Sequence, residues 1–191
     1  MKQLSNIYYA FRHGQSRANV EGIIISDPAV GTVEYGLTKT GREQVRESVE
    51  ASGFNGSELI VASDFRRARE TAEIIGEMLG VEQIVFDERL RERFFGEFEG
   101  KSHDHYSDTW EKDLYDPEQV HHGAESTESV RKRMWAVVES MEDRHAGRTI
   151  VLVSHGDPLM LLQTLFAEIG PEAHRSLEYI PTAGCRCLNP S

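Results

Sequence analysis

"YYAFRHGQSRAN", residues 8–19, begins as an apolar, aromatic run and ends on an arginine, a histidine and a glycine. Runs of this kind are typical of buried strands. A buried strand that ends on Arg12 and His13 indicates an anionic guest at that end, since these side chains would otherwise lack a partner. The stretch therefore predicts a strand that leads directly into an anion-binding site.

Similar runs recur along the chain and alternate with helical patterns. Strands are predicted at 7–11, 58–62, 83–86, 149–153 and 185–188, several without polar alternation, as expected for a sheet covered on both faces. The spacing of apolar residues predicts helices over 38–51, 66–79, 125–141 and 158–166. This alternation predicts an α/β fold, a three-layer α/β/α sandwich with a mostly parallel sheet, whose ligands bind at the carboxyl ends of the strands.

Size and composition narrow the class of protein. The 191 residues, 39% of them hydrophobic, are expected to form a single domain over 1–191. A formal net charge of −11 disfavours nucleic acid and anionic membranes as partners, and no N-terminal run has the length of a membrane span. Cys185 and Cys187 share one strand face, where a mutual bridge is geometrically poor. We therefore expect reduced thiols and a cytoplasmic protein, while the oligomeric state stays open.

Two of the predicted strands end alike, in FRHG at 11–14 and VSHG at 153–156. Their histidines should project at the same edge of the sheet, and the glycine after each would let a backbone amide approach a ligand. A third strand leads into SDFRRA at 63–68, with two arginines in the first turn of a helix. Cations are unfavourable there unless an anion joins them, because the helix dipole is already positive at that end. The three segments are therefore predicted to share one negative guest.

The motifs and their order resemble the histidine phosphatase superfamily, the phosphoglycerate mutase-like proteins. They are RHG at 12–14, SDFRRARETA at 63–72 with Phe65 in place of the usual leucine, LRERFFGEFEG at 90–100, GAES at 123–126 and SHG at 154–156. The resemblance covers most of the chain and implies a phosphoryl-transfer enzyme that needs no metal or other cofactor. It makes His13 the nucleophile and Glu92 the proton donor, and it surrounds His13 with the remaining site residues: Arg12, Gln15, Asn19, Arg67, His155 and Gly156.

The expected chemistry explains these residue types. Forked arginine donors stabilise the charge on the equatorial oxygens of a phosphate monoester. His13 must be uncharged at its attacking nitrogen, which neighbouring cations favour. Glu92 must protonate the leaving alkoxide and then activate water, which requires a raised pKa.

Three functions remain possible from the sequence. Hydrolysis of a small phosphorylated substrate is preferred to a mutase reaction, because the polar stretch 101–123, expected to be a long loop, is mostly acidic and would repel a second anion, as would Asp157. The mutase alternative stays open because the sequence does not show whether four other basic side chains point into the site. They are Arg17, Arg91, Arg93 and Lys101. A non-catalytic phosphate-binding module is the third possibility, although it would be expected to lack His13, an arginine or Glu92.

Two further features have two interpretations each. The isoleucines at 23–25 are expected to pack in the core in preference to lining a substrate wall, and Tyr106, Trp110 and Tyr115 could form an apolar pocket. Several histidines and acids of 101–125 could ligate a metal by residue type, but their spacing favours a solvated loop. Sugar phosphates, phosphoglycerates, nucleotide-pathway intermediates and phosphoprotein all fit as substrates.

Overall fold

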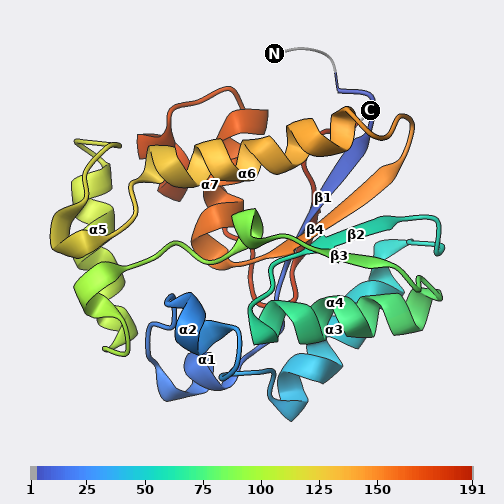
Figure 1. Ribbon diagram of the computed structural model, residues 1–191, viewed down its shortest axis with the longest axis horizontal. Coiled ribbons are helices and arrows are strands. Elements are labelled where there is room, and N and C mark those ends of the chain that lie inside the picture. The colour runs from blue at the N-terminus through green and yellow to red at the C-terminus, as the bar shows by residue number, and fades with distance from the viewer. Residues whose placement is uncertain (1–3, 191) are drawn as a thin grey trace.

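The structure is a computed structural model that describes residues 4–190 (Figure 1). Its sheet has the strand order β3-β2-β4-β1-β5. The strands are β1 (Ile7–Arg12), β2 (Leu59–Ala62), β3 (Ile84–Phe86), β4 (Thr149–Ser154) and β5 (Cys185–Cys187). The first four are mutually parallel, and β5 pairs antiparallel with β1. The predicted α/β class with a mostly parallel sheet is confirmed.

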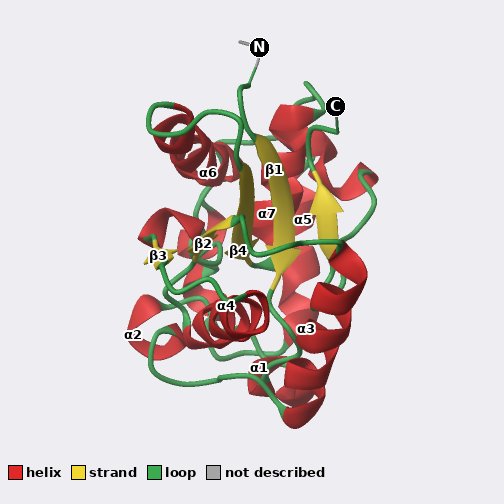
Figure 2. Ribbon diagram, turned by 90° about the vertical axis from the view of Figure 1, so that its right-hand side faces the viewer, coloured by secondary structure: helices red, strands yellow, loops and turns green. Residues whose placement is uncertain are grey.

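Helices cover both faces of the sheet (Figures 1 and 2). The α-helices are α1 (Arg17–Glu21), α2 (Pro28–Gly31), α3 (Lys39–Ser52), α4 (Arg66–Leu79), α5 (Tyr106–Asp113), α6 (Thr127–Glu142) and α7 (Gly156–Phe166). The 3₁₀ helices are η1 (Glu88–Leu90), η2 (Gly96–Phe98), η3 (His103–His105), η4 (His121–Gly123) and η5 (Pro171–Ser176). No helix within residues 4–190 combines the length and apolarity that crossing a bilayer requires.

The two helical layers follow from the alternation of side chains along the central strands. Ile150 and Leu152 of β4 point into the core formed with α6 and α7. Val151 and Val153 point into the opposite core, with α3 and α4. All four side chains are fully buried, and burial of an aliphatic side chain contributes roughly 1.5–3 kcal/mol. A strand without polar residues is stable here because both of its faces are covered.

The boundaries of the four predicted helices lie within two residues of those expected, and side-chain caps set the start of two of them. The Thr38 side chain accepts a hydrogen bond from the amide of Gly41, so α3 begins at Lys39. Ser126 caps α6 in the same way, which moves its start from the predicted 125 to Thr127. Each serine or threonine cap satisfies an amide that would otherwise lack a partner at the first turn.

The segment 101–123 differs from the expected long loop, since it contains α5 between two 3₁₀ turns. The α5 sequence, YSDTWEKD, has no apolar stripe, and its fully buried residues are Thr109 and Asp113. Asp113 forms a buried ion pair with Arg93, with Nη1 and Oδ2 2.6 Å apart. A buried charge pair therefore joins this helix to the body of the protein, and hydrophobic periodicity does not reveal such a contact.

The register of the sheet brings the three predicted motifs to one edge. Arg12 at the end of β1 pairs with Ser154 at the end of β4. The amide of Ser63, which follows β2, donates to the carbonyl of Val153. The segments after β1, β2 and β4 therefore leave the sheet side by side, at its carboxyl edge.

Candidate active site

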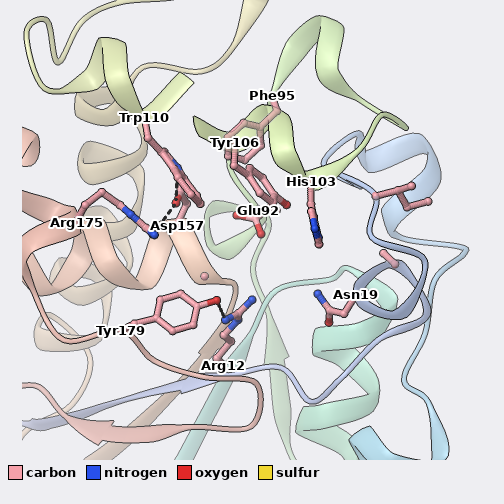
Figure 3. A pocket seen from close by; sticks show the side chains of 13 residues that line it. Arg12, Asn19, Glu92, Phe95, His103, Tyr106, Trp110, Asp157, Arg175 and Tyr179 are labelled. Atoms are coloured by element: carbon pink, nitrogen blue, oxygen red, sulfur yellow. Dashed lines mark hydrogen bonds and ion pairs between the residues drawn. The ribbon is translucent and has the colours of Figure 1, made fainter. Parts of the chain in front are cut away.

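Two cavities that share part of their lining lie at this carboxyl edge. The inner one, of about 20 Å³, is lined by His13, Arg67 and Glu92 among others. The outer one, of about 240 Å³, includes Arg12, Asn19 and Glu92 in its wall (Figure 3). Arg12, Asn19 and Glu92 line both cavities, so the two cavities are adjacent parts of one candidate site.

His13 is held in one tautomer. Its Nδ1 lies 2.8 Å from the carbonyl oxygen of Gly14, and a carbonyl only accepts, so Nδ1 carries the proton. Its Nε2 therefore presents a lone pair, and it accepts a hydrogen bond of 3.1 Å from Nε of Arg67. Burial, together with the charges of Arg67 and Arg12, holds the pKa of His13 well below 6.5. The imidazole is consequently neutral, with its unprotonated nitrogen beside a guanidinium.

The two arginines are fixed by backbone carbonyls. Arg67 donates through Nη2 to the carbonyl of Ile25 at 3.0 Å. Arg12 donates through Nη1 to the carbonyl of Ile180 at 3.1 Å and to the hydroxyl of Tyr179. Nε of Arg12 and Nη1 of Arg67 are buried without a hydrogen-bond partner among the described residues. Buried polar groups normally have partners, so unused donors next to a cavity indicate an anion site.

His155 lies behind His13, with ring centroids 5.2 Å apart. Its Nε2 is 2.9 Å from the hydroxyl of Ser63, and its Nδ1 is a third buried nitrogen without a partner in the described chain. Burial and the charge of Arg67 lower the pKa of His155 well below 6.5. His155 lines neither cavity, so it reaches the site as a neutral neighbour of His13.

Glu92 is a buried carboxyl group between the two cavities. Its Oε2 lies 3.8 Å from Nη2 of Arg67, and its Oε1 accepts the amide of Arg93 at 2.9 Å. Burial raises its pKa to about 7, with a further contribution from the charge of Asp157. The attraction of Arg67 opposes this shift. A carboxyl group with this pKa gives and takes a proton near neutral pH.

Two of the expected binding residues face the outer cavity. Oδ1 of Asn19 accepts from the amide and hydroxyl of Ser16, which leaves the amide nitrogen directed to the cavity (Figure 3). Gly156 begins α7, lines the outer cavity and lies against the guanidinium of Arg12. The positive end of α7 therefore faces the same region as the arginines.

Gln15 and Gly14 lie elsewhere. The side chain of Gln15 accepts from the hydroxyl of Thr38, and Gln15 lines neither cavity. The amide of Gly14 donates to the hydroxyl of Thr71, so it does not approach a ligand as expected. A Cβ on Gly14 would stand 2.4 Å from the carbonyl oxygen of Gly41. Glycine is required here for close packing against α3, which is a correction to the expected amide contact.

Aromatic side chains form part of the outer wall. Tyr106 and Trp110 stack with ring centroids 5.1 Å apart, and both line the outer cavity, as does Ile23. Ile24 packs in the core as expected, whereas Ile23 lines both cavities and Ile25 lines the inner one, so the expected core packing is wrong for these two residues. Tyr115 is 87% exposed, so the predicted aromatic pocket contains two of its three proposed members.

Sequence reasoning missed three residues of this wall: His103, Arg175 and Tyr179. Arg175 and Tyr179 come from the segment that precedes β5, and His103 lies in the stretch expected to be a loop. None of them belongs to a recognisable motif, so a signal for them would have required knowing which loops meet over the site.

The basic residues that kept the mutase alternative open do not line the two cavities. Arg91 pairs with Asp64, with Nη2 and Oδ2 2.7 Å apart. Arg93 is buried between Asp113 and Asp157. Nζ of Lys101 lies 5.7 Å from the ring centroid of Phe98.

No group of three or more His, Cys, Asp or Glu side chains within residues 4–190 is arranged to hold a metal ion.

The family model of the histidine phosphatase superfamily (branch 1) matches residues 8–190, and the chain belongs to this family. The chain is 34% identical to "Putative phosphoserine phosphatase 2" of Hydrogenobacter thermophilus, covering 86% of this chain and 80% of that protein. It is 32% identical to "Probable phosphoglycerate mutase GpmB" of Salmonella paratyphi C, covering 88% and 78%.

Solved structures agree with this assignment. A mycobacterial glucosyl-3-phosphoglycerate phosphatase superposes with a TM-score of 0.79 at 27% identity, over 94% of this chain and 90% of that one. Bacillus stearothermophilus YhfR superposes with a TM-score of 0.76 at 30% identity, over 94% and 89%. The family thus includes similar proteins named for phosphatase and for mutase activity.

Proposed function

We propose that this protein hydrolyses phosphate monoesters of small metabolites through a phosphohistidine at His13, without a metal ion. The observation that carries the proposal is the fixed tautomer of His13, whose unprotonated Nε2 lies 3.1 Å from Nε of Arg67. A neutral imidazole beside a guanidinium combines a nucleophile with a group that attracts phosphate.

The first step forms the phosphoenzyme. Nε2 of His13 attacks phosphorus, the bond between phosphorus and the ester oxygen breaks, and Glu92 gives its proton to the leaving oxygen. In the second step the Glu92 carboxylate takes a proton from water, whose oxygen attacks phosphorus. The bond from Nε2 to phosphorus breaks and releases inorganic phosphate. The pKa of Glu92, raised to about 7, supports both roles.

The surrounding residues stabilise the transferred group. Arg12 and Arg67 are assigned to its equatorial oxygens, because each has a buried nitrogen without another partner in the described chain. Asn19 and the amide end of α7 at Gly156 are assigned to its orientation. His155 is assigned as a neutral donor and as the support of the His13 ring. Gln15 is left out of the binding set, since its side chain is bound to Thr38.

A mutase reaction is the second candidate, because one relative is named "Probable phosphoglycerate mutase GpmB". Hydrolysis is preferred because Arg91 and Arg93 are engaged in ion pairs and line neither the inner nor the outer cavity. A reaction started from 3-phosphoglycerate distinguishes the two: hydrolysis releases inorganic phosphate, whereas a mutase produces 2-phosphoglycerate.

The direct test uses p-nitrophenyl phosphate and the variant His13→Ala. The wild-type protein should release p-nitrophenol and, after rapid acid-free quenching, should carry an acid-labile phosphate that the variant lacks. Equal turnover by both proteins would refute the assignment of the nucleophile.

We further propose a cytoplasmic location, which the unpaired state of Cys185 and Cys187 supports.

A further inference from the structure

Arg175 stands on the outer wall of the site with its guanidinium stacked on an indole (Figure 3). It lies in η5, and its Cζ is 3.8 Å from the ring centroid of Trp110. Trp110 also stacks on Tyr106, at an interplanar angle of 10°. Stacking fixes the plane of the guanidinium, so little side-chain freedom is lost when its edge binds a ligand.

The donors of Arg175 are not used within the protein. Across residues 4–190 its side chain donates no hydrogen bond, and its ion pair is a distant one, with Nη1 4.0 Å from Oδ1 of Asp157. Both oxygens of Asp157 accept Nε1 of Trp110 at 3.0 Å. Oδ2 of Asp157 also lies 3.3 Å from Nη1 of Arg93. The Asp157 carboxylate therefore has closer partners than Arg175, whose forked edge remains available at the cavity.

Arg175 lies close to the part of the site assigned to phosphate. Its Cζ is 5.9 Å from the ring centroid of Tyr179, and Cζ of Arg12 is 4.9 Å from the same centroid. Both guanidinium groups line the outer cavity. A small molecule with its phosphate at Arg12 and His13 would thus extend past Tyr179 toward Arg175.

We propose that Arg175 binds a carboxylate on the leaving group, which makes the preferred substrates phosphate monoesters of small hydroxy or amino acids. The planar fork of arginine matches the two oxygens of a carboxylate. A singly charged group fits better than a second phosphate dianion, because the negative charge of Asp157 lies 4.0 Å from Arg175. This inference rests on the proposed phosphatase function and deepens it. It also replaces the expectation that this side of the site repels every second anion.

The alternative role of Arg175 is structural, as a brace for Trp110 and α5. The two roles differ in what they do to substrates. A brace affects all phosphate esters alike, since it acts on the shape of the cavity. Loss of a carboxylate partner lowers kcat/KM for the esters that carry a carboxylate. It leaves the relative kcat/KM values of the esters without a carboxylate unchanged.

The experiment compares pairs of substrates that differ at the carboxylate. O-Phosphoserine is paired with O-phosphoethanolamine, and 3-phosphoglycerate with glycerol 3-phosphate, so that an amino group is present in one pair and absent in the other. The wild-type protein should prefer the acid in each pair by about 10- to 100-fold in kcat/KM, as expected for a bidentate charged contact. Arg175→Gln should bring both ratios close to one, and Arg175→Lys should give intermediate ratios.

Arg17→Gln is the matched control, because Arg17 is an exposed arginine outside both cavity walls, and it should keep the wild-type ratios. Ratios near one in the wild-type protein would overturn the proposal without any variant. Wild-type ratios that persist in Arg175→Gln would also overturn it, in favour of the structural role. A stronger preference for glycerol 1,3-bisphosphate than for the acids would assign Arg175 to phosphate instead.

Turnover of p-nitrophenyl phosphate separates this proposal from the proposed function. Ratios near one with His13-dependent turnover would refute the carboxylate site alone. Absence of His13-dependent turnover on every phosphate ester would refute the phosphatase function on which it rests.

Discussion

Nε of Arg67 donates a hydrogen bond of 3.1 Å to Nε2 of His13, so the nitrogen assigned as nucleophile faces a cation from the next layer of the fold. Arg67 belongs to the first turn of α4, whereas His13 follows β1. The parallel register of β1, β4 and β2 brings the two together. The sheet thereby brings two distant positions in the chain together in the candidate site.

Replacement of Arg67 by methionine should lower kcat for p-nitrophenyl phosphate by about 10²- to 10³-fold, the usual cost of removing one donor to transition-state charge. It should also raise the pKa of His13, because the charge of Arg67 is one of the causes that lower it. Steady-state kinetics and NMR titration of the imidazole measure the two effects.

Arg66→Gln is the matched control for that change. Arg66 precedes Arg67 in α4 but pairs with Glu70, with Nε and Oε1 2.9 Å apart. Its loss should leave kcat within a few-fold of the wild-type value. A comparable fall in both variants would mean that the effect of Arg67 comes from the helix and not from the site.

Glu92 should set the alkaline limb of the pH profile. Its pKa is raised to about 7, so it loses the proton needed for the first step above that pH, and kcat/KM for an alkyl phosphate should fall there. Glu92→Gln should impair alkyl phosphates far more than p-nitrophenyl phosphate, whose leaving group needs no proton. An equal loss on both substrates would contradict the role as acid.

The same profile tests why the pKa of Glu92 is raised. The negative charge of Asp157 contributes to the rise, so Asp157→Asn should move the alkaline limb to lower pH. Asp113→Asn is the control, because Asp113 pairs with the same Arg93 at 2.6 Å but is not among the main causes of the Glu92 shift. A limb that moves equally in both variants would assign the shift to Arg93.

Stability should fall in acid because two buried histidines stay neutral. The pKa values of His13 and His155 are held well below 6.5, so between 6.5 and these lowered values the unfolded chain binds up to two protons that the folded chain does not. Glu92 acts in the opposite sense between about 7 and 4.5, where the folded state holds the extra proton. In the pH window where the histidines and Glu92 both contribute, the unfolded chain binds one proton more than the folded chain. The free energy of unfolding then changes by about 1.4 kcal/mol per pH unit.

Urea unfolding at several pH values between 4.5 and 6.5 measures this slope. His13→Asn removes one of the two histidines and should bring the slope of the free energy of unfolding close to zero in that window. A slope that is unchanged in the variant would mean that His13 is protonated in the folded protein.

The strands and main helices could be predicted from the sequence because their cause is local or nearly so. The apolar run of β4 and the spacing of apolar residues along α4 are visible in the chain itself. The site residues that could be predicted, such as His13 and Arg67, stand in motifs at strand ends.

The residues that could not be predicted depend on contacts between distant segments. Arg175 and Tyr179 come to the cavity because the segment before β5 passes over it. The sequence predicts that the amide of Gly14 contacts a ligand, whereas in the structure glycine is needed because α3 packs closely against it. The positions of Arg175 and Tyr179 and the role of Gly14 are determined by tertiary packing, which the periodicity of apolar residues in the sequence does not predict.

The buried pair of Arg93 and Asp113 should be the main attachment of α5 to the body of the protein. Both side chains are fully buried, and Arg93 donates to Asp113 at 2.6 and 2.8 Å. Asp113→Ala removes the closest counter-ion of a buried arginine and leaves Asp157, 3.3 Å from Nη1, as the remaining one. It should cost up to about 3–5 kcal/mol in the free energy of unfolding, measured by urea denaturation. Asp108→Ala, on the same helix but with its side chain 53% exposed, should cost less than about 1 kcal/mol. Equal costs for the two would mean that the aromatic stack of Tyr106 and Trp110, and not the ion pair, holds α5 over the site.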